Sequence, residues 1–179
     1  AVSILDIASN DGTFLKFFNK NKYKRVGIDP AKNLSKFSKK QGIKHLSKYF
    51  TFKNSKFIKN FFGRFDVITA NHVCAHVSDL NDFFLGVKLL LNNRGIFIFE
   101  VSYLGSVIKK KTFDTIYHEH ADYHSLGPLV KFVKKFRLDI FNFEIVKAQG
   151  GSIRVYACNK GVREINKEKI KKKIFVEKK

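Results

Sequence analysis

A chain of 179 residues, 44% of them hydrophobic, can bury the core of one domain, but it has no apolar run long enough to span a membrane. Its net charge of +20 comes mostly from lysine rather than from arginine, the better reader of phosphates and bases, so the charge is weak evidence for RNA binding and mild evidence for an anionic ligand. The two cysteines, Cys74 and Cys158, are far apart and in no C-x-x-C pair. They indicate neither a zinc knuckle nor a disulfide framework, and a reducing cytoplasm fits this pattern best.

The first half of the chain alternates short apolar runs with turn signals and helical spacing. The expected strands are residues 2–8, 25–29, 43–46 and 65–71. The expected helices are residues 14–18 and the lysine-rich stretch 31–41. The run at 65–71 is apolar almost throughout, as is typical of a strand that is covered on both faces.

The second half continues the alternation and then changes character near its end. Asp79 is expected to cap a helix whose apolar stripe runs from Leu80 to Leu91, and residues 92–95 break that helix. The expected later elements are strands at 95–101, 140–146 and 152–158, a helix at 129–136 with Pro128 near its start, and a charged helical tail at 163–179. The last two strands have no helix between them, which predicts an antiparallel edge pair.

This order of elements predicts an α/β fold of the doubly wound, Rossmann-like kind. The sheet is expected to have seven mostly parallel strands, an antiparallel terminal pair, and helices on both faces joined by right-handed crossovers. Ligands of such sheets bind at the carboxyl ends of the strands, near the switch point between strands one and four. We therefore expect the site at that edge.

The first strand-to-helix turn has the composition of a cofactor site. Small residues let the backbone approach a ligand there, and the single glycine is too little for the dinucleotide motif G-x-G-x-x-G. An acid on the first strand suits a cationic ligand, and an acid ending the second strand suits ribose hydroxyls. This layout predicts S-adenosylmethionine, with another nucleoside ligand as the alternative. The predicted cofactor-binding residues are Asp6, Ala8, Ser9, Asn10, Asp29, Pro30 and, at the end of the fourth strand, Asn71.

Three proton-transferring side chains stand together in the sequence FDTIYHEHADYHS. Tyr117, Glu119 and His120 suit acid–base chemistry near neutral pH, whether the segment is helical or extended. The alternative is a polar loop with surface histidines. A metal site built from His118, His120 and His124 is not predicted, because their spacing matches no common helical zinc pair.

Beyond these features, the chain resembles the methyltransferase domain of the sugar C-methyltransferases, which act on nucleotide-linked 4-keto-hexoses. Six blocks in family order carry the resemblance: ILDIASNDGTFLKFF (4–18), GIDPAKN (27–33), FDVITANHVCAHVSDLNDFFLGVKLLL (65–91), FEVSYL (99–104), FDTIYHEHADYHS (113–125) and GGSIRVYAC (150–158). Ala8 stands where the family often has glycine, and a methyl group is small enough that binding should survive. The resemblance implies a class I methyltransferase domain at 1–159 that lacks the family's N-terminal zinc-binding portion. It also implies that 160–179 is a linker or the start of a truncated C-terminal domain, so the chain, which has no methionine, is expected to be a fragment.

The resemblance also implies a reaction. A base removes the proton beside the ketone of a nucleotide-linked 4-keto-deoxysugar, and the enolate then attacks the methyl group of S-adenosylmethionine. His120 is expected to be the base, Tyr117 to stabilise the enolate oxygen, Glu119 to orient a histidine or bind hydroxyls, and His76 to join them in the substrate pocket. Glu100, at the end of the fifth strand, is expected to be a pocket wall or a cap. The alternatives are an O- or N-methyltransferase acting on a small molecule and, from the charge, an RNA methyltransferase.

Overall fold

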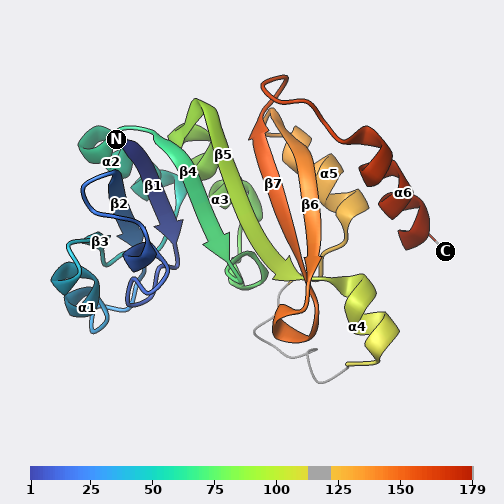
Figure 1. Cartoon of the computed structure of the whole chain (residues 1–179), viewed down its shortest axis with the longest axis horizontal. Coiled ribbons are helices and arrows are strands. Elements are labelled where there is room, and N and C mark those ends of the chain that lie inside the picture. Colours follow the sequence, from blue (N-terminus) through green and yellow to red (C-terminus); the bar gives the residue numbers. More distant parts are fainter. Residues whose placement is uncertain (113–121, 179) are drawn as a thin grey trace.

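The computed structural model describes residues 1–112 and 122–178, which form a single seven-stranded sheet with helices around it (Figure 1). The strand order is β3-β2-β1-β4-β5-β7-β6. Only β7 runs antiparallel to its neighbours, so the predicted fold class is confirmed, including the antiparallel pair at the end of the chain. The strands are β1 (Val2–Ile7), β2 (Tyr23–Ile28), β3 (Lys44–Leu46), β4 (Phe65–Asn71), β5 (Leu91–Ser102), β6 (Leu138–Val146) and β7 (Ser152–Asn159).

Helices of both the α and 3-10 kind connect these strands. The α-helices are α1 (Ser35–Lys40), α2 (Phe52–Phe62), α3 (Leu80–Leu90), α4 (Leu104–Lys110), α5 (Leu126–Lys134) and α6 (Lys167–Glu177). The 3-10 helices are η1 (Leu15–Phe17), η2 (Cys74–His76) and η4 (Ala148–Gly150). As expected, Asp79 caps α3: its Oδ1 accepts hydrogen bonds from the backbone N–H groups of Asn81 and Asp82 at 2.9 and 3.0 Å.

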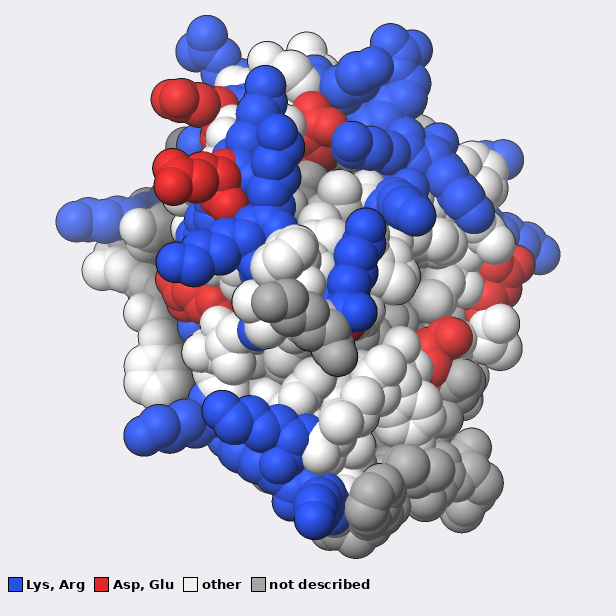
Figure 2. Space-filling view, turned by 90° about the vertical axis from the view of Figure 1, so that its right-hand side faces the viewer, with Lys and Arg blue, Asp and Glu red and all other residues white. Residues whose placement is uncertain are grey.

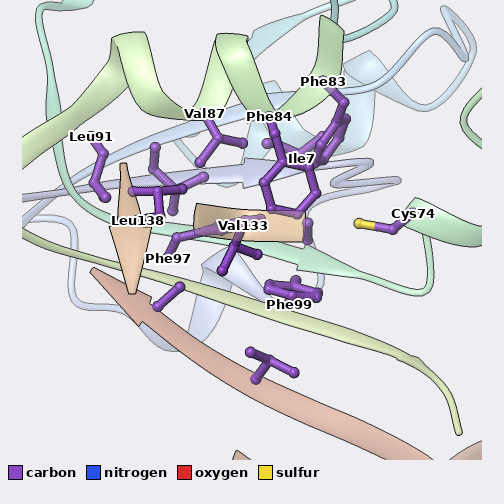
Figure 3. Close-up of a cluster of buried hydrophobic side chains, with 14 of the residues drawn as sticks. Ile7, Cys74, Phe83, Phe84, Val87, Leu91, Phe97, Phe99, Val133 and Leu138 are labelled. Carbon is purple, nitrogen blue, oxygen red and sulfur yellow. The ribbon is translucent and has the colours of Figure 1, made fainter. Parts of the chain in front are cut away.

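One face of the sheet carries the main hydrophobic core. Because side chains alternate along a strand, the register places Ile7, Ala70 and Phe99 on the same face. Phe84 of α3 packs over this face, with its ring 5.7 Å from those of Phe97 and Phe99 in edge-on geometry (Figure 3). Ring pairs of this kind add to the stability that comes from burying apolar area. Helices α2, α3, α5 and α6 all contribute buried residues to the same core.

The opposite face is covered unevenly. Leu15 of η1 and Ile43 pack on Ile4, which covers the β1 and β2 side. Over β5 and β7, alternate residues such as Ile98 and Tyr156 stay half-exposed, and no helix among the described residues lies in front of these strands in Figure 1.

Several element boundaries differ from the sequence-based expectation. The segment 14–18 forms only the three-residue η1, because it buries Leu15 alone and leaves Phe17 exposed. Helix α1 is shorter than the predicted 31–41, and β5 begins at Leu91, so residues 92–95 belong to the strand. Helices α2 and α4 were not predicted. The tail helix was predicted, and its Ile170 is buried in the main core.

Candidate active site

A hollow of about 660 Å³ lies where the carboxyl ends of β1 and β2 meet the segments that follow β3 and β4. Parallel strands bring these ends to one edge, which is where the sequence predicts the site. Its walls include Ala8, Asp29, Pro30, Phe50, His76 and Phe83. Three of the predicted cofactor residues and one predicted substrate residue therefore share one cavity.

The turn after β1 is tightly curved toward β2. Ala8, Asn10 and Gly12 have φ values of 58°, 51° and 85°, in the left-handed region. The N–H groups of Ala8 and Ser9 both donate to the carbonyl of Ile28, at 2.8 and 3.2 Å. Left-handed backbone costs a non-glycine residue roughly 1–2 kcal/mol, so Ala8 is held in a conformation that glycine would adopt without strain. The small side chain at this position leaves the backbone close to the hollow.

Asp29 is oriented by the same turn. Its Oδ2 accepts from the N–H of Asn10 at 3.1 Å, and its Oδ1 accepts from the N–H of Ala31 at 2.8 Å. A carboxylate has about four acceptor positions, so both oxygens can still accept hydrogen bonds from a ligand. A carboxylate at this position, beside the aromatic ring of Phe50, fits the ribose and base of a nucleoside.

Asp6 lies behind the turn, on the sheet face opposite Ile7. Its carboxyl group is buried, and its Oδ1 accepts a hydrogen bond of 2.6 Å from the hydroxyl of Thr69. Burial raises the pKa of Asp6 to about 7, against the opposing effect of the Thr69 hydrogen bond and with a smaller contribution from the charge of Asp29. Close by in the chain, the buried hydroxyl of Ser9 has no hydrogen-bond partner in the described structure.

Whether the site fits S-adenosylmethionine depends on which of these groups reach the hollow. Asp6 and Ser9 do not line it, and the Ser9 hydroxyl lies against Gly27. Asp29 does line the first hollow, and its acceptor oxygens fit the ribose of the cofactor. The residues that reach the hollow therefore fit the nucleoside of S-adenosylmethionine, with the buried carboxyl group of Asp6 behind them.

Asn71 lies in a second hollow, of about 390 Å³, on the less covered face of the sheet. Thr69, which is bonded to Asp6, lines the same hollow together with Glu100, Arg154 and Tyr156. The two hollows share no lining residue. Asn71 does not line the first hollow, and its predicted role at the cofactor stays a prediction.

A charged network joins the ends of three neighbouring strands beside the second hollow. Oε1 of Glu100 is 3.0 Å from Nε2 of His72, and Oε2 lies 2.9 Å from a terminal guanidinium nitrogen of Arg154 and 3.0 Å from its Nε. The Glu100 side chain is only 5% exposed, so these partners replace the water that the carboxylate loses on folding. Glu100 is thus a pocket wall, as expected, and also the centre of a network that the sequence did not indicate.

The remaining predicted residues divide into two groups. His76 ends η2 and lines the first hollow, beside Asp29 rather than in a separate pocket. Tyr117, Glu119 and His120 lie outside the described residues, so their placement relative to His76 stays a prediction.

One wall of the first hollow was not predicted from the sequence. Tyr49, Phe50 and Thr51 line it just before α2, and the hydroxyl of Thr51 caps that helix by accepting from the N–H of Asn54 at 3.1 Å. A threonine three residues before a polar amide, ahead of an apolar run, is the available signal for such a helix start.

The described part of the chain contains neither a membrane-spanning helix nor a cluster of metal-ligating side chains. No helix there is long and apolar enough to cross a membrane. No group of three or more histidine, cysteine or acidic residues is arranged there to hold a metal ion. Cys74 and Cys158 are both buried and unbridged, and burial raises the pKa of the Cys74 thiol to about 12.

Comparison with solved structures supports the fold. An S-adenosylmethionine-dependent methyltransferase from Clostridium acetobutylicum superposes with a TM-score of 0.66, at 16% identity, over 89% of this chain and 84% of that one. A second, from Anabaena variabilis, gives a TM-score of 0.68 at 12% identity, over 89% and 77% of the two chains.

Comparison of sequences supports the family. The C-methyltransferase NovU of Streptomyces niveus is 32% identical over 155 residues, which is 87% of this chain and 37% of that protein, so the chain spans little more than a third of this relative. The profile of a family described as a methyltransferase domain matches residues 2–146. S-adenosylmethionine is the cofactor of this class of enzyme, in agreement with the acceptor oxygens that Asp29 presents to the first hollow. The chain belongs to the methyltransferase domain family.

Proposed function

We propose that this domain methylates a carbon atom beside the ketone of a nucleotide-linked 4-keto-deoxysugar. The observation that carries the proposal is the relative that is named a C-methyltransferase, at 32% identity over most of the chain. The proton-transferring residues Tyr117, Glu119 and His120 support it, because methylation of oxygen or nitrogen needs no base strong enough to remove a proton from carbon.

The cofactor would be held by the turn after β1 and by Asp29, and it would supply an electrophilic methyl group. Asp29 would accept hydrogen bonds from the ribose, and the ring of Phe50 would contact the base. The buried carboxylate of Asp6 would favour the cationic end of the cofactor electrostatically. In this arrangement the turn places the backbone of Ala8, rather than a long side chain, against the ligand.

The chain's own residues would handle the proton. His120 would accept it from the carbon beside the ketone, and Tyr117 would donate a hydrogen bond to the enolate oxygen that results. Glu119 would orient the imidazole, and His76 would contact the sugar from the wall of the first hollow. The electron pair left on carbon would form the bond to the methyl group while the bond between that methyl group and sulfur breaks, so that S-adenosylhomocysteine would leave.

Exchange of the substrate proton with deuterated solvent tests this proposal. We expect the protein to catalyse exchange at the carbon beside the ketone of a nucleotide-linked 4-keto-6-deoxyhexose, as measured by mass spectrometry and NMR. His120→Asn should slow the exchange by about 100-fold, since it removes the base. His118→Asn, which changes a histidine in the same segment, serves as the matched control and should have little effect. Absence of exchange together with full turnover by His120→Asn would overturn the proposal and favour an O- or N-methyltransferase.

A second test concerns the cofactor alone. We expect Asp29→Ala to weaken the binding of S-adenosylhomocysteine by about tenfold or more, because it removes a charged acceptor from the ribose position. Asp11→Ala is the matched control. Asp11 also lies in the turn and caps it, accepting from the N–H of Thr13 at 2.9 Å, but it does not line the hollow. Calorimetric titration measures both, and equal affinities for Asp29→Ala and the parent chain would exclude the assigned role.

A further inference from the structure

Most of the arginine side chains gather at one edge of the sheet. On the side of the molecule that Figure 2 shows, lysine and arginine side chains form several separate groups, so positive charge by itself singles out no site. Of the six arginines, Arg25 donates to backbone carbonyls inside the fold and Arg154 pairs with Glu100. The other four lie near the starts of β4, β5 and β6 or beyond the end of β7: Arg64, Arg94, Arg137 and Arg163. Because the guanidinium group matches oxyanions well, this edge has the composition of an anion site.

A third hollow, of about 290 Å³, lies at this edge, opposite the cofactor turn. Strands β5 and β6 begin there and the antiparallel β7 ends there, so residues far apart in the sequence meet (Figure 1). We call it the amino-edge hollow, and it shares no residue with the first or the second hollow. Its walls combine three cationic side chains with two amides and a valine: Lys88, Arg137, Lys160, Asn93, Asn159 and Val162.

Lys88 of α3 is held in place in the wall of the amino-edge hollow. Its Nζ donates to the side-chain oxygen of Asn159 and to the carbonyl of Arg137, the latter at 3.5 Å. The amide nitrogen of Asn159 in turn donates to the carbonyls of Asn92 and Asn93, at 2.9 and 3.1 Å. These contacts within the described chain use two of the three N–H donors of Lys88, and the third is left for a ligand.

The positive charge of the hollow is not neutralised within the described part of the chain. No salt bridge there involves any of its three cations. Burial lowers the pKa of Lys88, and the charges of Arg137 and Arg64 lower it further. Asp139, two residues after Arg137, accepts from the N–H of Gly161 at 3.0 Å and does not line the hollow. A bound anion would relieve the repulsion among these cations, which favours its binding.

The side chains of the walls suit a phosphate group. A guanidinium offers a fork of N–H donors that matches phosphate oxygens, and an ammonium group adds charge. The side-chain oxygen of Asn93 accepts from Arg64 at 3.5 Å, so the amide NH₂ of Asn93 is left to donate. No aromatic side chain among the described residues lines the hollow, which has less than half the volume of the first hollow. A nucleobase therefore finds no stacking surface in it.

We propose that the amino-edge hollow binds a phosphate group, as free phosphate or as the end of a small phosphorylated molecule. The guanidinium of Arg137 and the ammonium groups of Lys88 and Lys160 contact the phosphate oxygens, and the amide of Asn93 donates to one of them. The site lies at the opposite edge of the sheet from the cofactor turn and contacts no reacting atom. It is therefore independent of the proposed function, and phosphate bound there stabilises the folded domain.

Thermal unfolding with and without inorganic phosphate, at an ionic strength kept constant with potassium chloride, tests the inference. At a phosphate concentration ten times the Kd found by calorimetric titration, we expect the Tm of the parent chain to rise by about 4 °C. Arg137→Gln with Lys160→Gln should weaken binding by about tenfold or more, since both charged donors are lost, whereas Arg137→Lys alone should weaken it less. The matched control is Lys39→Gln with Lys40→Gln, which removes two exposed lysines from the last turn of α1 and should leave the affinity unchanged. The transition in potassium chloride alone shows that each variant is folded.

Three outcomes would overturn the inference: no effect of phosphate on the parent chain, equal losses in the two glutamine pairs, or competition between phosphate and S-adenosylhomocysteine. Tighter binding of an RNA oligonucleotide than of phosphate, weakened by Arg137→Gln with Lys160→Gln, would also overturn it and make the edge a nucleic-acid surface. Titration with glycerol 3-phosphate separates the two sources of the phosphate group. Tighter binding than that of inorganic phosphate supports a phosphorylated molecule, and weaker binding supports free phosphate.

Discussion

Asp6→Asn is expected to make the domain more stable above pH 7 and, at the same time, weaker in binding its cofactor. The carboxyl group of Asp6 is buried behind the cofactor turn, and its pKa is raised from 3.8 to about 7. A difference of this size corresponds to about 4 kcal/mol between the folded and unfolded states. The asparagine side chain has nearly the same shape and can still accept the hydrogen bond from Thr69.

The direction in which stability changes with pH follows from whether the folded or the unfolded state holds the proton of Asp6. Between pH 3.8 and about 7 the folded state keeps the proton on Asp6 while the unfolded state has lost it. Stability therefore falls as the pH rises through this window, and the full penalty remains above it. Asparagine does not ionise, so Asp6→Asn does not lose this stability. Its free energy of unfolding should exceed that of the parent chain by little near pH 4 and by about 4 kcal/mol at pH 8.

Urea unfolding at a series of pH values measures this difference in stability. Asp66→Asn is the control, because it is expected to lower the stability at neutral pH where Asp6→Asn raises it. Burial tends to raise the pKa of Asp66, but hydrogen bonds from Ser3 and Asn92 outweigh it and hold that pKa below 3.8. Asp66 therefore stabilises the fold above pH 4, and its replacement should destabilise the domain at neutral pH. A parent chain whose stability does not fall between pH 4 and 7 relative to Asp6→Asn would contradict the assignment.

The cofactor measurement gives the function of Asp6. A cationic ligand favours the ionised carboxylate, so S-adenosylmethionine should bind the parent chain more tightly as the pH rises through 7. Asp6→Asn should bind weakly at every pH. A group that lowers the stability of the free protein and raises the affinity for its ligand is typical of a binding site, where stability and function compete.

Elements of the fold were predicted correctly where the apolar residues of the sequence are also the residues that the structure buries. The run at 65–71 coincides with β4, whose Phe65 and Ile68 are fully buried, and Asp79 caps α3 as its side chain and position indicate. Helix α2 was missed for a physical reason. Its Ile58 is fully buried, but Phe61 on the same helix is 68% exposed, so the apolar residues do not form one stripe.

The candidate site was predicted where it depends on residues close together in the chain. Ala8 and Asp29 follow from two strand-ending turns, and both line the first hollow. The network around Glu100 depends instead on contacts across the sheet. Its partners lie 28 and 54 residues away in the chain, at a register that only the folded sheet establishes. Spacing alone carries no information about such a pair.

That network leads to the second large effect. Arg154→Met is expected to lower the free energy of unfolding by about 3 kcal/mol, because among the described residues it leaves the buried Glu100 carboxylate with His72 as its side-chain partner. Glu100→Gln should lower the free energy of unfolding by less than Arg154→Met does, since the Arg154 side chain is 39% exposed and water can solvate the guanidinium. The double variant should lose less than the sum of the two, because no unpaired buried charge remains in it.

Glu144→Gln is the matched control for this cycle. Glu144 also faces Arg154, at 3.9 Å, but its side chain is 48% exposed, and an exposed pair contributes only about 0–1 kcal/mol. Thermal and denaturant unfolding measure the stability of the parent chain and of the four variants. Additive losses for Glu100 and Arg154 would show that the two groups do not act as a buried pair.

Turnover by the same variants shows what the network is for. If Glu100 served only to stabilise the sheet, the double variant would regain activity along with its stability. We expect stability without activity, because Glu100 and Arg154 line the hollow that also contains Asn71, and Glu100 orients His72 at the carboxyl end of β4. If neutral residues can replace this charged pair without loss of stability but not without loss of activity, the role of the pair is to set the geometry of the site.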